Sequence, residues 1–402
     1  MIEIAVGNNA SEDSSQAGAI AATEAFEKMS KGQNEAFPLI AFVFASSNFN
    51  YEQVLSGVRA SLGDAVSIVG ASSAGEITTS GPTMRNSVAL MLLRSDTLLC
   101  TTGVANGLTE DSFKAGVSLA EDLKAATVPK LLMMFADGLK GNGSAIMRGI
   151  LSVLGDHFPV VGGSAGDNGK LVETHQFLND TVYTDAVVGV GFSGDFKFSI
   201  GVNHGWNAIG APQKVTKATG TTIHEIDNLP AISLYERYLG TEQVAHLKAE
   251  MLGEVALSYP LGIKDVQSDE FLLRAPFAVT DDGSIVCGGE VLEGAEVQLM
   301  IGSKADAITA AKKAAETALE NLQSTPKVAF IFSCHVRNTL FANKATALEE
   351  IKAIKNVIGE EVPLIGFYTY AEQAPLGGSS YNIKKCNPEL HNETVVITLL
   401  GE

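Results

Sequence analysis

The residues best suited to hold a small polar ligand form two groups in the C-terminal part of the chain. The first group is Cys334, His335 and Arg337, and the second is Tyr368, Tyr370 and Glu372. A guanidinium binds a carboxylate through paired hydrogen bonds, and a nearby acid binds an amine, so Arg337 and Glu372 together match the two charges of an amino acid. The same types are equally consistent with ordinary packing, in which Arg337 pairs with a neighbouring acid.

Histidines and one tryptophan extend the candidate pocket. His391 precedes the last strand, and Trp206, the only tryptophan, stands two residues after His204. If the ligand is haem instead of a polar molecule, His335 and His204 are the candidate axial ligands. The seven histidines are otherwise dispersed, and the sequence leaves the choice of ligand and the presence of a metal open.

Two catalytic patterns occur in an unsuitable context. Residues 162–166 match G-x-S-x-G, but the segment after Ser164 reads as extended, where a nucleophile elbow requires a helix. Residues 189–194 match G-x-G-x-x-G, and they are followed by another strand, where a dinucleotide site requires a helix. We therefore expect a binding protein and no enzyme, with a hydrolase that uses Ser164 or Cys334 as the alternative.

A repeated element must position these residues. An apolar strand runs into a glycine and then, five or six residues later, an acid, in residues 67–76, 159–167 and 363–372. A buried parallel strand that ends in such a turn is where open α/β sheets place ligands. The sequence therefore predicts the site at these turns.

The repeat is also visible in its spacing. A proline opens a buried strand 32, 33 and 40 residues before the glycine, as shown by the pairs Pro38 and Gly70, Pro129 and Gly162, and Pro326 and Gly366. Apolar periodicity predicts helices between the strands, among them 14–29, 51–62 and 304–322. Val297 to Ile301 is expected to be the first strand of the third unit, and 195–295 to join two halves.

We thus predict an α/β protein of two parts, 1–207 and 208–402. It contains three strand-helix-strand-helix-strand units, with mixed sheets covered by helices.

Composition narrows the class of protein. The 402 residues are 46% hydrophobic and 18% charged, which suffices for a large core. A net charge of -18 disfavours nucleic acid and anionic membranes as partners. No apolar run approaches a membrane span, no signal peptide is evident, and four isolated cysteines suit a reducing compartment. The expectation is a cytoplasmic protein without membrane insertion.

With these motifs in order, the chain resembles the FIST family of sensory domains, in both its N-terminal and its C-terminal parts. The resemblance is carried by seven stretches: 69–76, 161–167, 204–206, 230–235, 334–337, 365–370 and 391–394. The family usually has a glycine before the acid of the last turn, and this chain has Ala371 there.

The resemblance implies a ligand-binding sensor. Members are thought to bind small molecules, amino acids among them, and stand-alone bacterial members include haem proteins that respond to nitric oxide and control a histidine kinase. No kinase, cyclase or methyl-accepting segment is visible here, so the output is expected to pass to a separate partner such as a histidine kinase. We expect a small polar ligand, with Trp206 near the mouth of its pocket.

Overall fold

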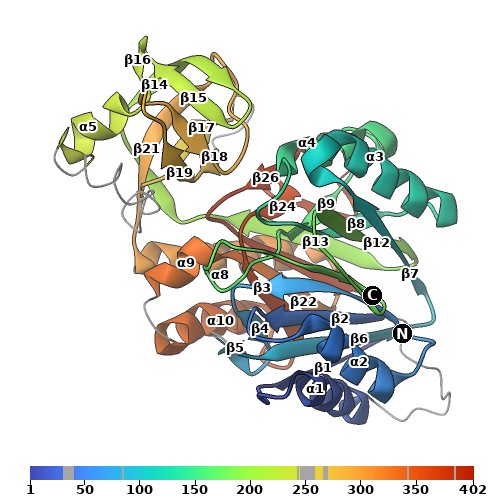
Figure 1. Cartoon of the computed structure of the whole chain (residues 1–402). Coiled ribbons are helices and arrows are strands. Elements are labelled where there is room, and N and C mark those ends of the chain that lie inside the picture. The colour runs from blue at the N-terminus through green and yellow to red at the C-terminus, as the bar shows by residue number, and fades with distance from the viewer. Residues whose placement is uncertain are drawn as a thin grey trace.

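Three β-sheets surround one apolar core in the computed structural model, and a fourth sheet forms a lobe beside them (Figure 1). The structure describes residues 1–29, 40–83, 86–241, 244, 259–265, 270–341, 344–383 and 386–402. Pro38 and Leu39, where the sequence predicts the start of the first buried strand, lie outside these ranges.

The predicted α/β class and its repeated units are confirmed. The first unit comprises β1 (Ile2–Asn9), α1 (Ser14–Lys28), β2 (Ile40–Ser46), α2 (Tyr51–Leu62), β3 (Ser67–Ser73) and β6 (Val88–Ser95). The second comprises β7 (Leu98–Asn106), α3 (Leu108–Ala126), β8 (Leu131–Ala136), α4 (Gly143–Leu154), β9 (Val160–Gly163) and β12 (Ala186–Gly194). The third comprises β13 (Lys197–Asn203), α8 (Lys304–Leu322), β22 (Pro326–Cys334), α9 (His335–Leu340), α10 (Lys344–Ile358), β23 (Leu364–Thr369) and β27 (Val395–Gly401).

Each unit completes its sheet with a hairpin from another unit. The strand orders β1-β6-β2-β3, β7-β12-β8-β9 and β13-β27-β22-β23 match one another. The hairpin β10 (Gln176–Leu178) and β11 (Thr181–Tyr183) joins β3, β24 (Glu372–Pro375) and β26 (Pro388–His391) join β9, and β4 (Glu76–Thr78) and β5 (Gly81–Thr83) join β23. The short β25 (Ser379–Ser380) pairs with β13. This cyclic exchange ties the three units into one body.

The first strand of the third unit differs from the prediction. β13 takes that place, since it pairs with β27 along its whole length, whereas Val297 to Ile301 belongs to β21 (Glu296–Gly302) of the lobe. The lobe is thus inserted between the first strand and the first helix of the unit. Adjacency in sequence could not reveal this insertion.

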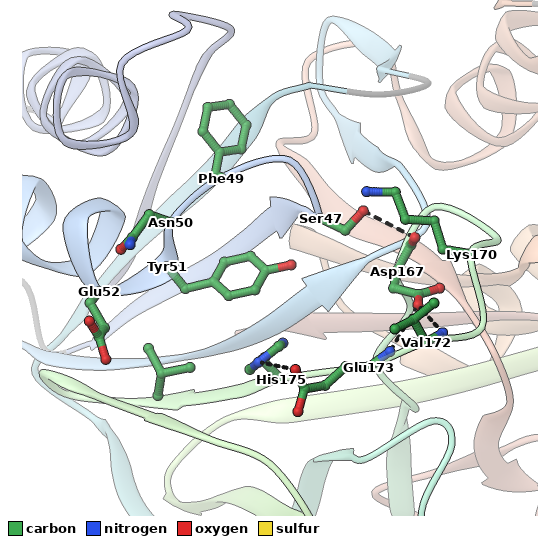
Figure 2. A pocket seen from close by; sticks show the side chains of 11 residues that line it. Ser47, Phe49, Asn50, Tyr51, Glu52, Asp167, Lys170, Val172, Glu173 and His175 are labelled. Atoms are coloured by element: carbon green, nitrogen blue, oxygen red, sulfur yellow. Dashed lines mark hydrogen bonds and ion pairs between the residues drawn. The ribbon is translucent and has the colours of Figure 1, made fainter.

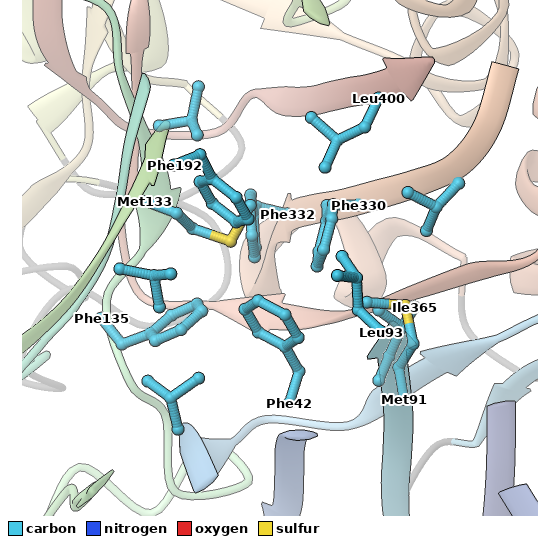
Figure 3. Close-up of a cluster of buried hydrophobic side chains, with 14 of the residues drawn as sticks. Phe42, Met91, Leu93, Met133, Phe135, Phe192, Phe330, Phe332, Ile365 and Leu400 are labelled. Atoms are coloured by element: carbon cyan, nitrogen blue, oxygen red, sulfur yellow. The ribbon is translucent and has the colours of Figure 1, made fainter. Parts of the chain in front are cut away.

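In each of the three sheets of the body, the central strands are buried on both faces. One face contributes to the central core, in which Phe42, Phe135, Phe192, Phe330 and Phe332 converge (Figure 3). The other face is covered by the two helices of the same unit, for example by α1 and α2 on the first sheet (Figure 1). This explains the continuous apolar runs of the strands.

The signature glycines permit close contact between parallel strands. A Cβ on Gly70 would lie 1.7 Å from the Val43 carbonyl oxygen, and one on Gly366 would lie 1.7 Å from the Ile331 carbonyl oxygen. Any side chain there would push β3 from β2, or β23 from β22.

The described part of the lobe contains an eight-stranded sheet and a short helix. Its strands are β14 (Trp206–Thr219), β15 (Thr222–Ile226), β16 (Leu229–Pro230), β17 (Leu261–Lys264), β18 (Phe271–Arg274), β19 (Pro276–Val279), β20 (Ile285–Cys287) and β21, with α5 (Ser233–Leu239). It extends from the body near α8 and α9 (Figure 1).

Candidate ligand-binding site

The three glycine-containing turns meet, although they are far apart in the sequence. Backbone hydrogen bonds link them, among them those from the N–H of Ala74 to the Tyr368 carbonyl (2.9 Å), from Ser164 to the Ala371 carbonyl (2.7 Å) and from Gly166 to the Ser72 carbonyl (3.0 Å). The turns therefore form one connected ring around which all three units are arranged.

The acids that define the sequence signature are not structurally equivalent. Glu76 and Glu372 are each the first residue of a hairpin, and each pairs with the residue that follows a signature glycine. In the hairpin of the second unit, this position is occupied by Gln176 and not by an acid. Asp167 comes nine residues earlier. Residues 168–175 are thus an insertion specific to the second unit.

A cavity of about 450 Å³ lies beside this insertion, where the first and second units meet (Figure 2). It is lined by Ser47, Phe49, Asn50, Tyr51, Glu52, Asp167, Lys170, Val172, Glu173, His175 and Val182. Ligand pockets typically occupy about 300–1,000 Å³, so the cavity has room for a small metabolite.

The start of α2 fixes one wall of the cavity. The Asn50 side chain accepts a hydrogen bond from the Gln53 N–H (3.0 Å) and caps the helix. Tyr51 follows directly, with its ring centroid 4.9 Å from that of His175 and 5.1 Å from that of Phe177. Figure 2 shows its hydroxyl directed toward Asp167.

Neither aromatic group of this wall carries a charge at neutral pH. Burial raises the pKa of Tyr51, which keeps its phenol protonated. Burial lowers the pKa of His175, and the carboxylate of Glu173 offsets this only in part.

Asp167 organises the opposite wall. Its Oδ1 accepts hydrogen bonds from the Leu171 N–H (2.9 Å) and the Tyr370 hydroxyl, and its Oδ2 accepts from the N–H groups of Val172 (2.7 Å) and Glu173 (3.1 Å). Burial opposes the charge on Asp167, but these hydrogen bonds outweigh it and lower its pKa. Asp167 is therefore ionised, and all its acceptor positions are used by the chain.

The remaining charged groups of the cavity are exposed. Lys170 Nζ donates to the neutral amide oxygen of Asn48 (3.1 Å). Toward the residues that the structure describes, the Glu173 carboxylate makes only long ion-pair contacts, 3.6 Å to His175 Nε2 and 4.0 Å to Lys140 Nζ. An ammonium and a carboxylate are thus both accessible to a ligand.

Residues of the third unit contact the inserted segment 168–175 on the side that does not line the cavity. The Tyr370 hydroxyl accepts a hydrogen bond from the Gly169 N–H (3.0 Å), and the His335 ring lies 6.0 Å from that of Tyr370. Gly169 has a φ of +79°, and a Cβ there would lie 2.8 Å from His335 Nε2. Two of the residues singled out in the sequence, His335 and Tyr370, therefore contact a wall of the cavity without lining it.

Replacement of Tyr370 by phenylalanine is expected to loosen residues 168–175, because it removes the hydroxyl that holds Asp167 and Gly169. A hydrogen bond to a charged group contributes about 1.5–3 kcal/mol. Hydrogen exchange of the backbone amides in 168–175 should accelerate by at least about tenfold, whereas Tyr238→Phe in the lobe should leave these amides unchanged. Unaltered exchange in Tyr370→Phe would show that the hydroxyl does not hold the segment.

Arg337 is engaged in the interior. Its side chain is fully buried and donates to Glu350 Oε1 (2.6 Å), to the Ala307 carbonyl (2.9 Å) and to the His204 carbonyl. Arg337 lies on the helix α9, which begins directly after β22. Arg337 and Glu372 form no ion pair with each other among the contacts of the described residues.

Cys334, Trp206 and Tyr368 are also interior residues. Trp206 is 4% exposed and belongs to an apolar cluster with Cys334 and Val336. Tyr368 is fully buried and packs with the residues between the third sheet and its helices. Burial raises the pKa of the Cys334 thiol well above its ordinary value, so the thiol is protonated.

Glu372 and His391 lie opposite each other in the pairing of β24 with β26. Glu372 accepts hydrogen bonds from Thr394 (N–H 3.1 Å, Oγ1 2.8 Å) and from Thr369, and His391 Nε2 lies 3.0 Å from the Ala374 carbonyl oxygen. Both side chains are buried, so they form part of the interior in this conformation.

The residues that line the cavity were not singled out by the sequence. Tyr51 reads as one apolar position of an amphipathic helix, and Lys170, Glu173 and His175 lie in a segment with no motif. The distinguishing feature becomes visible once the hairpins are placed, because Gln176 follows its signature glycine by 14 positions, whereas Glu76 and Glu372 follow theirs by six.

In the ranges that the structure covers, no group of three or more histidine, cysteine, aspartate or glutamate side chains is arranged to hold a metal ion. No helix within those ranges combines the length and apolar character needed to cross a bilayer.

Comparison with known proteins supports the resemblance seen in the sequence. The FIST N domain model matches residues 40–229, and the FIST C domain model matches residues 231–375. A similar protein is the uncharacterized protein MJ1623 of Methanocaldococcus jannaschii, 28% identical over 164 residues. The match covers 38% of this chain and 31% of that protein.

Similar solved structures are distant. A cyanuric acid hydrolase from A. caulinodans aligns over the whole of both chains with a TM-score of 0.36 and 10% identity. T. maritima PurL complexed with ATP aligns over 71% of its own length, and over all of this chain, with a TM-score of 0.21 and 11% identity.

Proposed function

We propose that this chain, which belongs to the FIST family of sensory domains and contains both its FIST N and its FIST C domain, senses an amino acid or a similar small polar molecule. The ligand binds in the cavity between the start of α2 and residues 167–175. The bound state is passed to a separate protein, for which a histidine kinase is the candidate that the family offers.

The cavity itself is the observation that carries this proposal. Accessible charges of both signs, Lys170 on one side and Glu52 and Glu173 on the other, line a volume suited to a small zwitterion. Lys170 would bind the carboxylate of the ligand, and a glutamate would bind its ammonium group. The Tyr51 ring supplies an apolar surface between them.

The arrangement also suggests how occupancy reaches the rest of the molecule. The cavity wall formed by residues 167–175 is hydrogen-bonded to the hydroxyl of Tyr370 in the third unit. The turn that carries Tyr370 is in turn hydrogen-bonded to the signature turns of the other two units. A ligand that shifts this wall would therefore act on all three units through hydrogen bonds already present.

Haem does not fit the residues proposed as its axial ligands. His335 Nε2 lies against Gly169, where even one added Cβ atom would be only 2.8 Å from this nitrogen. His204 Nδ1 accepts a hydrogen bond from the backbone N–H of Trp206 (2.9 Å). Neither histidine lines the cavity described above. We therefore favour the polar ligand.

A hydrolase is the less favoured alternative. The partner of the Ser164 hydroxyl is the side-chain amide of Gln373 (3.0 Å), which is no general base. The Cys334 thiol is buried and protonated. We propose a non-enzymatic sensor, and the free thiols, three of them buried, suit a cytoplasmic location.

Thermal unfolding in the presence of each of the twenty amino acids tests the proposal. A ligand at a hundred times its Kd should stabilise the protein by about 2.7 kcal/mol. For an amino acid that binds, Lys170→Ala should weaken the affinity measured by calorimetry by at least about tenfold. Lys313→Ala, on the exposed side of α8, is the matched control. If no amino acid stabilises the protein, or if Lys170→Ala binds as tightly as the wild type, the proposed function is wrong.

A further inference from the structure

The cavity holds more negative than positive charge. Glu52, Asp167 and Glu173 are its three carboxylates, and Lys170 is its only ammonium among the lining residues, since burial keeps His175 neutral. A zwitterion with an uncharged side chain would satisfy one charge of each sign. It would leave the cavity with excess negative charge at the position where the ligand side chain lies.

The three carboxylates differ in whether their oxygens are free to contact a ligand. Both oxygens of Asp167 are occupied by N–H and hydroxyl donors of the chain, so this residue shapes the wall and contributes its charge at a distance. Within the described ranges, the Glu173 carboxylate has ion-pair contacts of only 3.6 Å and 4.0 Å, and Glu52 is exposed on the first turn of α2. Two glutamates are thus accessible, where one suffices for an α-ammonium group.

Tyr51 adds a third feature that suits a cation. Its ring is held against His175 and Phe177 at the start of α2, so that it presents a fixed aromatic surface to the cavity. Aromatic faces attract ammonium and guanidinium groups, most strongly where water is partly excluded. The net charge of -18 for the chain further favours the approach of a cation.

We propose, resting on the function proposed above, that the ligand is a basic amino acid, with lysine, ornithine and arginine as the candidates. Lys170 binds its carboxylate. Glu52 and Glu173 bind its two cationic groups, and the aliphatic part of its side chain lies along Tyr51. Specificity for the basic side chain is therefore set by the second accessible glutamate.

Calorimetry with matched ligands tests this assignment. Probes are L-lysine, L-arginine, L-norleucine, which has the same chain length without the terminal ammonium, and L-glutamate. Lysine or arginine should bind at least about tenfold more tightly than norleucine, and glutamate should bind more weakly still. Because the site is open to solvent, the preference should decrease at high ionic strength.

Variants separate charge from shape. Glu52→Gln and Glu173→Gln should each weaken lysine binding by about tenfold, and the double variant should lose the preference for lysine over norleucine. Glu121→Gln, an exposed glutamate of α3, is the control and should bind like the wild type.

The possible results are distinguishable. If norleucine or glutamate binds as tightly as lysine, the basic-ligand inference fails while the amino-acid sensor remains. If cadaverine, which lacks the carboxylate, equals lysine, the assigned role of Lys170 fails. If no amino acid binds, both the inference and the proposed function fail.

Discussion

Replacement of Arg337 by methionine is expected to lower the free energy of unfolding by about 3–5 kcal/mol, because it leaves a buried carboxylate without its partner. The guanidinium donates to Glu350 over 2.6 Å, and neither side chain is exposed. It also donates to the Ala307 carbonyl on α8 and to the His204 carbonyl before the lobe. Urea unfolding at neutral pH measures the loss.

A double variant identifies the cause. Arg337→Met combined with Glu350→Leu should recover a large part of the loss, because apolar groups of similar size replace both charges. Lys312→Met, which breaks the exposed pair of Lys312 with Glu316 (3.4 Å), should change stability by less than about 1 kcal/mol. A small effect of Arg337→Met would contradict the buried pair. An unrecovered double variant would assign the loss to the backbone hydrogen bonds.

This buried pair corresponds to the packing alternative for Arg337, and it shows why the sequence could not decide between that alternative and a ligand site. Arginine beside histidine and cysteine after a buried strand is typical of a ligand site. Its partner Glu350 lies thirteen residues away, on the inward face of α10, among the isoleucines that mark that helix. Periodicity identifies a helix by its apolar positions, and it does not show that one buried position is an acid that neutralises a cation from another element.

The elements themselves were largely predictable, because local patterns determine them. The ranges 51–62 and 304–322 predicted as helices agree with α2 and α8, and the glycine of each signature turn lies where two strands approach closely. The error in the third unit has a different origin. A lobe inserted after β13 separates that strand from its helix, and only pairing with β27 reveals the true first strand.

The cavity could not be predicted from either unit alone. Tyr51 and Glu52 come from the first unit, whereas Lys170 and Glu173 come from the insertion in the second. They face one cavity because the second hairpin pairs with β3 of the first unit, and the register that places Gln176 beside Ala71 aligns the two segments. Such an exchange between repeats is a property of the assembled sheets.

A decrease in stability as the pH rises above neutrality is the second large effect that we expect. Glu372 and Glu393 are fully buried, and neither oxygen of Glu393 has a hydrogen-bond partner in the described part of the chain. Burial raises the pKa of Glu372 to about 7, although Thr369 and Thr394 offset part of the shift. Burial, and then the charge of Glu372, raise the pKa of Glu393 well above its ordinary value.

The direction follows from proton binding. The folded chain holds protons on these glutamates at a pH where the unfolded chain, with glutamate pKa values near about 4.3, has released them. The free energy of unfolding therefore falls as the pH rises toward and through the folded pKa values. His391 and His204 act oppositely, because burial lowers the pKa of His391 to about 3 and that of His204 to about 4.

The histidines change the free energy of unfolding little above about pH 7, because imidazoles of the unfolded chain are mostly neutral there. The thiols change it only above about pH 8, where they begin to ionise in the unfolded chain. Urea unfolding between these values should show stability falling by up to about 1 kcal/mol per pH unit. Glu393→Gln should flatten this dependence, because the amide keeps the shape without a titrating proton, while Glu320→Gln on the exposed side of α8 should retain it. A wild-type protein whose stability is constant or rises over this interval, or a Glu393→Gln variant with the wild-type slope, would show that Glu393 is already ionised or neutralised in the folded chain.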